Sequence, residues 1–337
     1  MPSNVAAPAV KQRIPYFDNV KFVLIVLVVL GHSLKLGPTD VFSSARAASV
    51  FIYSFHMPLF IFLTGLMLNR QKMTAEKTLT NVALFTGYGY LAKLLRAVVP
   101  YIFTGTFEFE AFSEGGLPWY MFVLAAFYGL AWLLRGCNFV LVGVVSLVLA
   151  LAAGYEPAID EFLCLSRVIV FFPFFWLGHA LSPKEVASFF ARPPVRVACV
   201  FVAVAFALLC ATHADELYLY RSLFLGRHGY AGVDVPNCTW VNRLLAYTMS
   251  LVMGCAVMGI VPQGYLPVAS KLGGRTLWVY LLHYEVLDVL RYATNFPDWL
   301  VSGPEWRWLV LIPGSFVLAC ILSLPLPVNP FAKLRKD

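Results

Sequence analysis

The chain has 337 residues, of which 60% are hydrophobic and 13% are charged, and its mean hydropathy is +0.76. Apolar runs throughout the chain exclude a soluble globular protein and indicate several membrane-spanning helices. The net charge of +7 comes from loop residues that anchor such helices, so it does not indicate a nucleic-acid partner.

About ten apolar segments follow one another, each close to the length of about twenty residues that crosses a bilayer as a helix. We expect these helices near residues 19–36, 47–68, 78–104, 118–135, 138–155, 164–182, 195–212, 241–260, 273–292 and 308–327. The predicted fold class is an all-α integral membrane protein with about ten transmembrane helices. One domain, residues 16–328, lies between an N-terminal tail, residues 1–15, and a basic C-terminal tail, residues 329–337.

Lysine and arginine residues collect in alternate loops, and acidic residues collect in the loops between them. One side receives Lys11, Arg13, Arg70, Lys72, Lys77, Arg135, Lys184, Arg192, Arg196, Lys271, Arg275, Lys333, Arg335 and Lys336. The other side receives Glu108, Glu110, Glu114, Glu156, Asp160 and Glu161. Because Lys and Arg mark the cytoplasmic side, both termini are predicted to be cytoplasmic. The expected location is a bacterial plasma membrane.

The 7 cysteines are scattered and form no C-x-x-C pair. Inside apolar spans a thiol behaves as a small hydrophobic group. The sequence therefore indicates neither a metal site nor a disulfide framework, and a single bridge between Cys164 and Cys238 stays open.

Three ionisable side chains share one face of the first predicted helix. Eleven steps of about 100° bring His32 to within about 20° of Lys21 and about 16 Å further along the helix. Asp18 precedes Lys21 on nearly the same stripe. A Lys, Arg or Asp at mid-helix costs about 2.5–3.5 kcal/mol in a membrane, which makes this line a functional-site hypothesis. The structural alternatives are a histidine bonded to a neighbouring helix and a lysine that snorkels to the headgroups.

The second predicted helix places a histidine next to a proline. His56 lies in mid-span, and Pro58 follows it. Proline interrupts the backbone hydrogen bonds of a helix and leaves a carbonyl free, so we expect a kink here. A functional role for His56 and a structural hydrogen bond across helices both fit the sequence.

Further motifs follow in order along the chain. Lys21 and His32 form an Arg/Lys-x10-His pair, and Phe55-His56-Met57-Pro58-Leu59-Phe60 is followed by Thr64-Gly65. Lys93-Leu-Leu-Arg96 precedes Pro100-Tyr101, and the later blocks are Leu117-Pro118-Trp119-Tyr120, Arg167 with residues 171–178, and residues 274–283. Together these motifs resemble the membrane-bound acyltransferase 3 family, most closely its fucose 4-O-acetylase-like sugar acetyltransferases. The third motif departs from the family's Arg-x-x-Arg element, because its first residue is Lys and its proline comes one residue late.

The resemblance spans about residues 16–290 and implies a membrane enzyme that moves an acyl group from cytosolic acyl-CoA to a hydroxyl of a sugar. In that family the histidine matching His32 is taken as catalytic, and the basic residue matching Lys21 as essential. Acetyl-CoA is the expected co-substrate, and no metal is expected. The expected partners are a carbohydrate or lipid-linked glycan acceptor and the lipid bilayer, and homo-oligomerisation stays open.

Acyl transfer from a thioester to an alcohol needs a base near the hydroxyl and a donor for the developing oxyanion. A neutral His32 suits the role of general base, and His56 is a second catalytic candidate. Lys21 and Asp18 lie near the predicted cytoplasmic end, where coenzyme A would enter. They are therefore candidates for binding the cofactor.

Five other side chains are binding candidates. Lys93 and Arg96 could hold the phosphates of coenzyme A, and binding an acceptor or an oxyanion fits them equally well. Arg167, His283 and Trp119 are candidates for binding the acceptor. A buried ion pair with Asp160 or Glu161 is the alternative for the arginine, and core packing is the alternative for the histidine.

The longest gap between predicted spans, residues 213–240, is expected on the outer side. It mixes His, Asp, Glu and Arg with Tyr and Gly, a composition suited to hydrogen bonding with a polar ligand. It is therefore a candidate acceptor-facing loop, and an ordinary solvated loop explains it equally well.

A multispan transporter or flippase is the main alternative class, because intramembrane His, Lys and Arg also form substrate pathways. No inverted internal repeat supports that alternative. The sequence does not identify the acceptor. It also does not distinguish an acetyl group from a longer acyl group.

Overall fold

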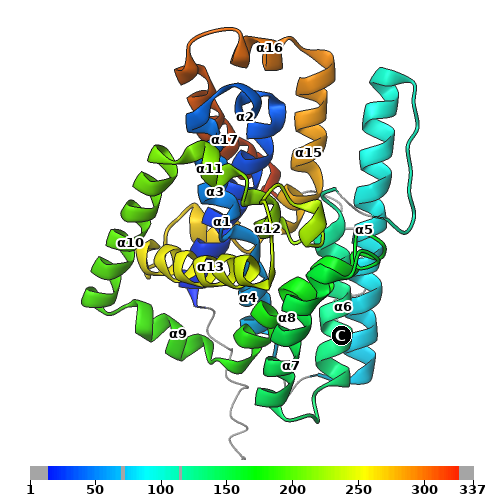
Figure 1. The fold of residues 1–337 in the computed structure, drawn as a ribbon, viewed down its shortest axis with the longest axis vertical. Helices are drawn as coiled ribbons and strands as arrows, with labels where there is room; N and C mark the ends of the chain where they lie inside the picture. The colour runs from blue at the N-terminus through cyan, green and yellow to red at the C-terminus, as the bar shows by residue number, and fades with distance from the viewer. Residues whose placement is uncertain (1–13, 70–72, 114–115, 326–337) are drawn as a thin grey trace, which may run out of the picture.

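The computed structural model describes residues 14–69, 73–113 and 116–325, and the regular elements there are helices (Figure 1). An isolated antiparallel bridge joins Ser113 to Phe162. The predicted C-terminal tail and nearly all of the N-terminal tail lie outside these residues, as do Arg70, Lys72 and Glu114 from the loop-charge argument.

The longer helices are α1 (Pro15–Ser33), α3 (Ser43–Tyr53), α4 (His56–Met67), α5 (Ala75–Thr104), α6 (Trp119–Leu133), α7 (Phe139–Ala152), α8 (Leu165–Ala180), α9 (Pro183–Phe190), α10 (Pro193–Thr212), α13 (Trp240–Ile260), α15 (Thr276–Ala293) and α17 (Leu311–Leu322). The short elements between them are η1 (Leu34–Leu36), α2 (Pro38–Val41), η3 (Ala153–Tyr155), α11 (Ala214–Tyr218), α12 (Arg221–Leu225), η4 (Tyr230–Gly232), α14 (Ala269–Leu272), α16 (Phe296–Val301) and η5 (Glu305–Val310). Each predicted apolar segment therefore contains at least one helix within its described residues.

Within the described residues, 6 helical segments are long and apolar enough to cross a membrane: Pro15–Leu36, Ser43–Met67, Ala75–Thr104, Pro193–Thr212, Trp240–Ile260 and Glu305–Leu322. Helices α8 and α9, bent by 90°, would make a seventh span. Two further apolar helices, α6 and the α7–η3 pair, are shorter, and α15 carries Glu285, Asp288 and Arg291. The chain is thus an all-helical multi-pass membrane protein, while the expected ten spans and cytoplasmic termini are not confirmed.

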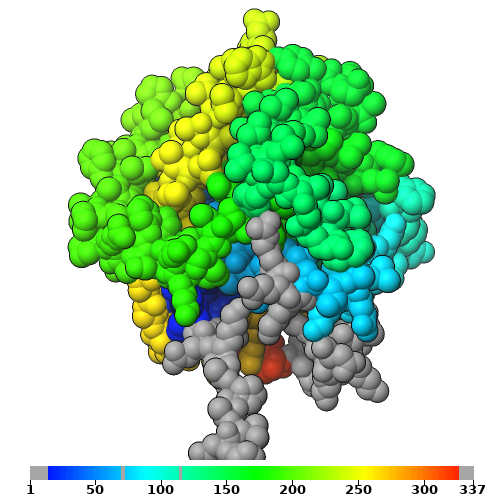
Figure 2. All heavy atoms as spheres, turned by 90° about the horizontal axis from the view of Figure 1, so that it is seen from below, coloured from blue at the N-terminus to red at the C-terminus, as the bar shows by residue number. Residues whose placement is uncertain are grey.

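Helix α1 lies near the centre of the molecule and packs against α3, α4, α14, α15 and α17 (Figure 1). Helices α5 and α6 pack together on one side, and α10 packs against α13 and α3 on the other (Figure 1). Helix α17, near the other end of the chain, packs against α1 in this centre. Red and dark blue atoms are both visible on the face drawn in Figure 2. Neighbouring helices therefore bury Asp18 on α1 and leave Lys21 partly exposed.

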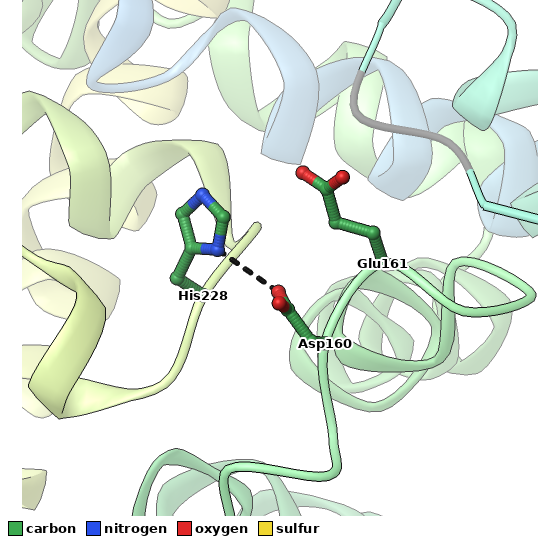
Figure 3. A group of neighbouring side chains, drawn as sticks. All are labelled: Asp160, Glu161 and His228. Carbon is green, nitrogen blue, oxygen red and sulfur yellow. Dashed lines mark hydrogen bonds and ion pairs between the residues drawn. The ribbon is translucent and has the colours of Figure 1, made fainter.

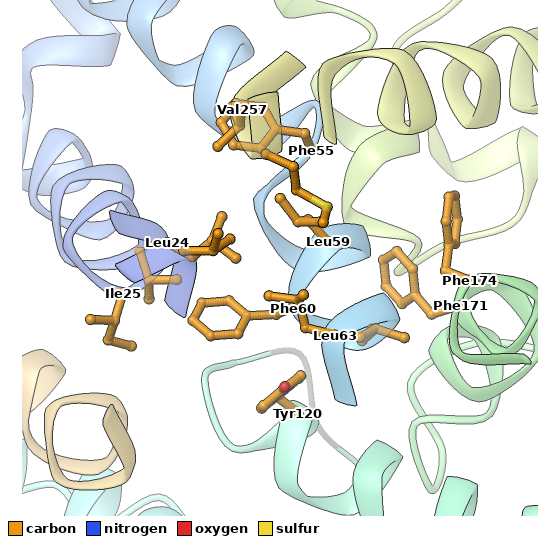
Figure 4. Packing of buried hydrophobic residues seen from close by; sticks show 14 of the residues in the cluster. Leu24, Ile25, Phe55, Leu59, Phe60, Leu63, Tyr120, Phe171, Phe174 and Val257 are labelled. Carbon is orange, nitrogen blue, oxygen red and sulfur yellow. The ribbon is translucent and has the colours of Figure 1, made fainter. Parts of the chain in front are cut away.

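The main hydrophobic core forms where α1, α4, α6, α8 and α13 converge (Figure 4). Leu24 and Ile25 come from α1, Leu59 from α4, Phe174 from α8 and Val257 from α13, and all are buried. Long apolar side chains fill this region with many close contacts, which stabilise the bundle through dispersion as well as exclusion of water and lipid.

Two glycines set the distance between α4 and α8. A Cβ atom on Gly65 would lie 2.0 Å from the carbonyl oxygen of Phe175, and one on Gly178 would lie 2.1 Å from the carbonyl oxygen of Phe62. Small residues at a crossing point let membrane helices approach closely, and here each glycine faces the backbone of the other helix. The crossing therefore fixes the C-terminal halves of α4 and α8 against each other.

The second predicted span is broken, as its proline indicated. Helix α3 ends at Tyr53, and α4 begins at His56, with Ser54 and Phe55 in a turn. Pro58 has no N–H to donate to the carbonyl of Ser54, the residue four positions earlier. The hydroxyl of Ser250 donates to this carbonyl at 2.6 Å instead. The break is thus satisfied by a neighbouring helix, and it turns His56 toward the site.

Candidate active site

A cavity of about 560 Å³ opens between α1, α4, α6, α8, α12 and α15, and its wall mixes polar and apolar groups. Four of the predicted site residues line it: His32, His56, Trp119 and Arg167. These residues come from four different helices. The fold therefore brings together side chains that lie far apart in the sequence.

His32 lies in the last turn of α1 and is half-buried. Its ring centroid is 5.3 Å from that of His283 and 5.1 Å from that of Tyr284. Its Nδ1 atom is enclosed and has no hydrogen-bond partner among the described residues. The residue lines the cavity.

His283 is fully buried in the middle of α15, directly behind His32. Its Nδ1 lies 2.7 Å from the carbonyl oxygen of Val279, which can only accept, so Nδ1 carries the proton. Nε2 is then a lone-pair acceptor, and it too is buried without a partner in the described part of the chain. Two neighbouring rings thus each present one unsatisfied buried nitrogen.

His56 forms another part of the wall, at the start of α4. Its Nδ1 lies 2.8 Å from the carbonyl oxygen of Ile52, so Nδ1 donates the hydrogen bond. The ring also packs edge-on against Tyr53, with centroids 4.9 Å apart. The helix break therefore fixes the orientation of His56, while its side chain still borders the cavity.

Trp119 and Arg167 form an aromatic and cationic side of the cavity. The Arg167 guanidinium lies 4.7 Å from the centroid of the Trp119 ring, and its Nε donates to the carbonyl oxygen of Leu225 at 3.4 Å. Phe171 also stacks on the Trp119 ring, with centroids 5.5 Å apart. An indole and a guanidinium at the mouth of a polar cavity suit the binding of a sugar ring.

Arg96 lies beside the site and contacts the aromatic ring of Tyr284. Its guanidinium lies 3.8 Å from the centroid of Tyr284, the ring that touches His32. An ion pair with the buried carboxylate of Asp288 holds this guanidinium, and Arg291 lies 3.9 Å from the same carboxylate. The sequence-based candidate Arg96 is thus in place beside the site, in contact with Tyr284.

Lys93 holds the loop that separates two cavities. Its Nζ donates to the carbonyl oxygens of Glu110 and Ser113, both at 2.6 Å. A second cavity of about 470 Å³ is lined by Lys93 and Arg96, and both cavities share Glu110 and Gly116. Lys93 therefore shapes the wall between them.

Lys21 and Asp18 lie at the other end of α1. Their side chains form an ion pair at 2.8 Å, and Asp18 is buried. Between them, Asn19 donates to the carbonyl oxygens of Pro262 and Gly264 at 2.9 and 2.8 Å. Neither Lys21 nor Asp18 lines the 560 Å³ cavity, so this ion pair lies apart from it, and their predicted role in binding coenzyme A stays a prediction.

An acidic pair and a histidine meet at the rim of the cavity (Figure 3). Ligand atoms of Asp160, Glu161 and His228 lie within 4.8 Å of one another, a spacing that a metal ion could bridge. Asp160 is 2.9 Å from the Nδ1 of His228, however, and Glu161 forms an ion pair with Arg227. The Arg227 guanidinium beside Glu161 opposes a divalent ion, and Asp160 already contacts His228, so the cluster is explained by its own contacts.

The long outer loop contributes to the cavity. Phe224, Leu225 and Arg227 from this segment, residues 213–240, line the wall. Its first part is tied to α3, because Arg46 and Ser43 donate hydrogen bonds to the carboxylate of Asp215. These bonds favour the charged form and lower the pKa of Asp215 below its ordinary value.

Sequence reasoning missed several residues of the site. Lys35 lines the cavity one helical turn beyond His32, and its spacing from the histidine was a usable signal. Tyr284 follows His283 directly, and Asp288 lies one turn further along the same helix. The partners of Asp160 and Glu161 could not be chosen without the fold. All 7 cysteines, including Cys164 and Cys238, are free thiols.

Comparisons with known proteins identify the family of the chain. A family model described as an acyltransferase domain matches residues 14–326, nearly the whole chain, so the chain belongs to the acyltransferase 3 family. It is also similar to the nodulation protein NolL of Sinorhizobium fredii, with 26% identity over 318 residues, covering 82% of this chain and 80% of that protein. No solved structure matches the chain. The family resemblance of the motifs is confirmed, and the protein is a membrane acyltransferase.

Proposed function

We propose that the protein is an O-acetyltransferase that moves an acetyl group from cytosolic acetyl-CoA to a hydroxyl of a sugar or cell-surface glycan precursor, with His32 as the general base. The observation that carries this proposal is the cavity, where a histidine with one available ring nitrogen meets an indole and a guanidinium. The family supports acyl transfer as the reaction class.

In this mechanism Nε2 of His32 takes the proton of the acceptor hydroxyl as its oxygen attacks the thioester carbonyl. The C–O bond forms, the C–S bond of the thioester breaks, and the proton passes from the histidine to the departing thiolate. The base must be neutral at the start, so its proton resides on Nδ1. An acyl ester and free coenzyme A are the products.

His283 fits the role of a positioning residue for this base. Its Nε2 is an acceptor without a partner among the described residues, and the unsatisfied Nδ1 of His32 belongs to the neighbouring ring. A hydrogen bond between these nitrogens would satisfy both buried atoms and fix the His32 tautomer with Nε2 free. An acceptor on the far nitrogen also increases the basicity of a catalytic histidine, as in other triads.

The donor end of the pathway follows from the proposed topology. If both termini are cytoplasmic, the ion pair of Lys21 and Asp18 marks the cytoplasmic end of α1 and His32 lies toward the outer leaflet. Acetyl-CoA would then enter from one side, and the acceptor would reach the cavity past Trp119 from the other. Lys93 and Arg96 border the second cavity, so they are candidates for guiding either ligand between them.

The test uses purified protein, labelled acetyl-CoA and a panel of mono- and oligosaccharide acceptors. We expect transfer of label to a hydroxyl, loss of at least about a hundredfold in rate for His32→Ala, and little change for His213→Ala, an exposed histidine that does not line the cavity. If His32→Ala still transferred the acetyl group at the wild-type rate, His32 would not be the general base. Movement of an unmodified sugar across proteoliposomes without acyl transfer would favour a transporter.

A further inference from the structure

We propose that the natural acceptor carries a negatively charged group next to the hydroxyl that is acylated, and that Lys35 binds this group. The inference rests on the proposed function, because it names the substrate class of the same cavity. Its basis is an excess of positive charge on one side of that cavity.

Lys35 lies in η1, one turn beyond His32, and its side chain lines the cavity. Its ammonium is 5.8 Å from the centroid of the Tyr53 ring, and it makes no ion pair with a carboxylate among the described residues. A cationic group held in a protein cavity without an acid partner retains a strong preference for an anion. The cavity offers the space in which that anion would lie.

Other cations surround Lys35. Arg167 and Arg227 line the same cavity as Lys35. Arg221 lies behind the wall, 4.3 Å from the centroid of Tyr53, and its Nε donates to the hydroxyl of Ser49. Like charges gathered in a medium of low dielectric repel one another, and a bound anion would offset this cost.

The acids nearby do not balance this charge. Glu161 forms an ion pair with Arg227, and Asp160 pairs with His228 at the rim. Glu110 is the remaining acid in the lining, against the cations Lys35 and Arg167. The wall therefore carries a net positive charge beside the candidate base.

The acceptor is a better source of this anion than the acyl donor. Lys35 is only about 4.5 Å along the helix axis from His32, given a rise of 1.5 Å per residue. The pantetheine arm, with its two amide units, separates the thioester from the nearest phosphate of coenzyme A. When the thioester carbonyl is at His32, that phosphate lies well beyond the reach of Lys35.

Two sources of the charge share this chemistry: a carboxylate on the sugar itself and a phosphate that joins the sugar to a lipid carrier. The experiment measures equilibrium binding to full-length His32→Ala protein, which holds ligands without turnover. One arm compares a glucuronate-containing tetrasaccharide with its carboxyl-reduced counterpart. The other arm compares a short-chain isoprenyl diphosphate sugar with the matching uncharged isoprenyl glycoside.

We expect one charged probe to bind at least about tenfold more tightly than its neutral counterpart, and the preference to weaken as salt rises. Adding Lys35→Met should abolish the preference, Lys35→Arg should keep most of it, and Lys77→Met, at an exposed position on α5, should leave it unchanged. Acetyl-CoA affinity should be the same in all four proteins. Equal binding of charged and neutral probes, absence of binding by both charged probes, or a loss of acetyl-CoA affinity in Lys35→Met would overturn the proposal.

Failure of this inference and failure of the proposed function give different results. If the protein acetylates neutral sugars as well as charged ones, the proposed reaction is supported and the proposed preference for a charged acceptor is wrong. If a charged probe binds through Lys35 but the protein with His32 intact transfers no acyl group, the proposed anion site is supported and the proposed reaction is wrong.

Discussion

Replacing Gly65 by alanine should separate α4 from α8. The new Cβ would lie 2.0 Å from the carbonyl oxygen of Phe175, while ordinary Cβ contacts begin near 3.4 Å. The facing backbone must therefore recede by about 1.4 Å, and a backbone carbonyl cannot rotate out of the way as a side chain can. Gly178→Ala makes the mirror-image contact with Phe62, at 2.1 Å.

The magnitude follows from the crossing geometry. Overpacking costs about 1–3 kcal/mol, and a clash with backbone belongs at the upper end. Alanine also gains about 1 kcal/mol of helix propensity over glycine, which leaves a net loss of about 2 kcal/mol. One separation of the helices relieves both contacts, so the double variant Gly65→Ala with Gly178→Ala should lose clearly less than the sum of the two single losses.

The assay is the apparent Tm of the detergent-solubilised protein at a fixed heating rate, because unfolding of such proteins is commonly irreversible. Gly87→Ala is the matched control: it lies in mid-helix on α5, and its Cβ would meet no atom within 4 Å. It should keep or raise the apparent Tm. An unchanged Tm in Gly65→Ala and Gly178→Ala, or strictly additive losses in the double variant, would refute this account of the crossing.

Three further predictions concern the site and its supports. His283→Leu removes the acceptor beside His32 and should lower kcat about tenfold to a hundredfold with little change in KM, whereas His283→Gln, which can still accept, should recover part of the rate. Ser250→Ala leaves the carbonyl of Ser54 without its donor in the apolar interior and should cost about 1–3 kcal/mol, seen as a lower apparent Tm. Because the pKa of Asp215 is lowered in the folded protein, its contribution is complete above the ordinary aspartate pKa and is lost as pH falls through the lowered value, so Asp215→Asn should lower the Tm at pH 7 but not in strong acid.

Each of these has a distinguishing outcome. Equal rates for the Leu and Gln variants of His283 would exclude the hydrogen-bonding role, and a change confined to KM would indicate acceptor binding instead. Thr248→Ala controls for Ser250, because that hydroxyl bonds only within its own helix, to Leu244. A Tm difference between wild type and Asp215→Asn that persists unchanged in acid would show that the ion pair is not its source.

Apolar length and spacing were enough to predict most of the helices. A run of twenty apolar residues has few alternatives to a helix in a bilayer, because every backbone group must be satisfied within the segment. Pro58 likewise predicted the break in the second span, since it removes a hydrogen bond wherever the helix lies. The bend of 90° between α8 and α9 was not predicted, because it depends on how the two segments pack.

The motifs also predicted four of the residues that line the cavity, but not the contacts between them. Lys21 and His32 share a helix face by sequence spacing, yet the structure sets them to different tasks: Lys21 pairs with Asp18, while His32 faces a cavity. Arg96 lies beside the site, but its partners Tyr284 and Asp288 belong to a helix almost two hundred residues later in the chain. Such contacts cannot be read from local spacing.

The sequence by itself determined that this is a helical membrane protein, and its ordered motifs determined the acyltransferase 3 family. Both conclusions rest on local properties, namely segment hydrophobicity and residue spacing along one helix. Only the tertiary structure decided that His283 lies behind His32, that Lys35 faces the same cavity, and that the acids at the rim are already paired. Side-chain contacts between distant helices depend on the crossing of the whole bundle, which close packing at points such as Gly65 and Gly178 fixes.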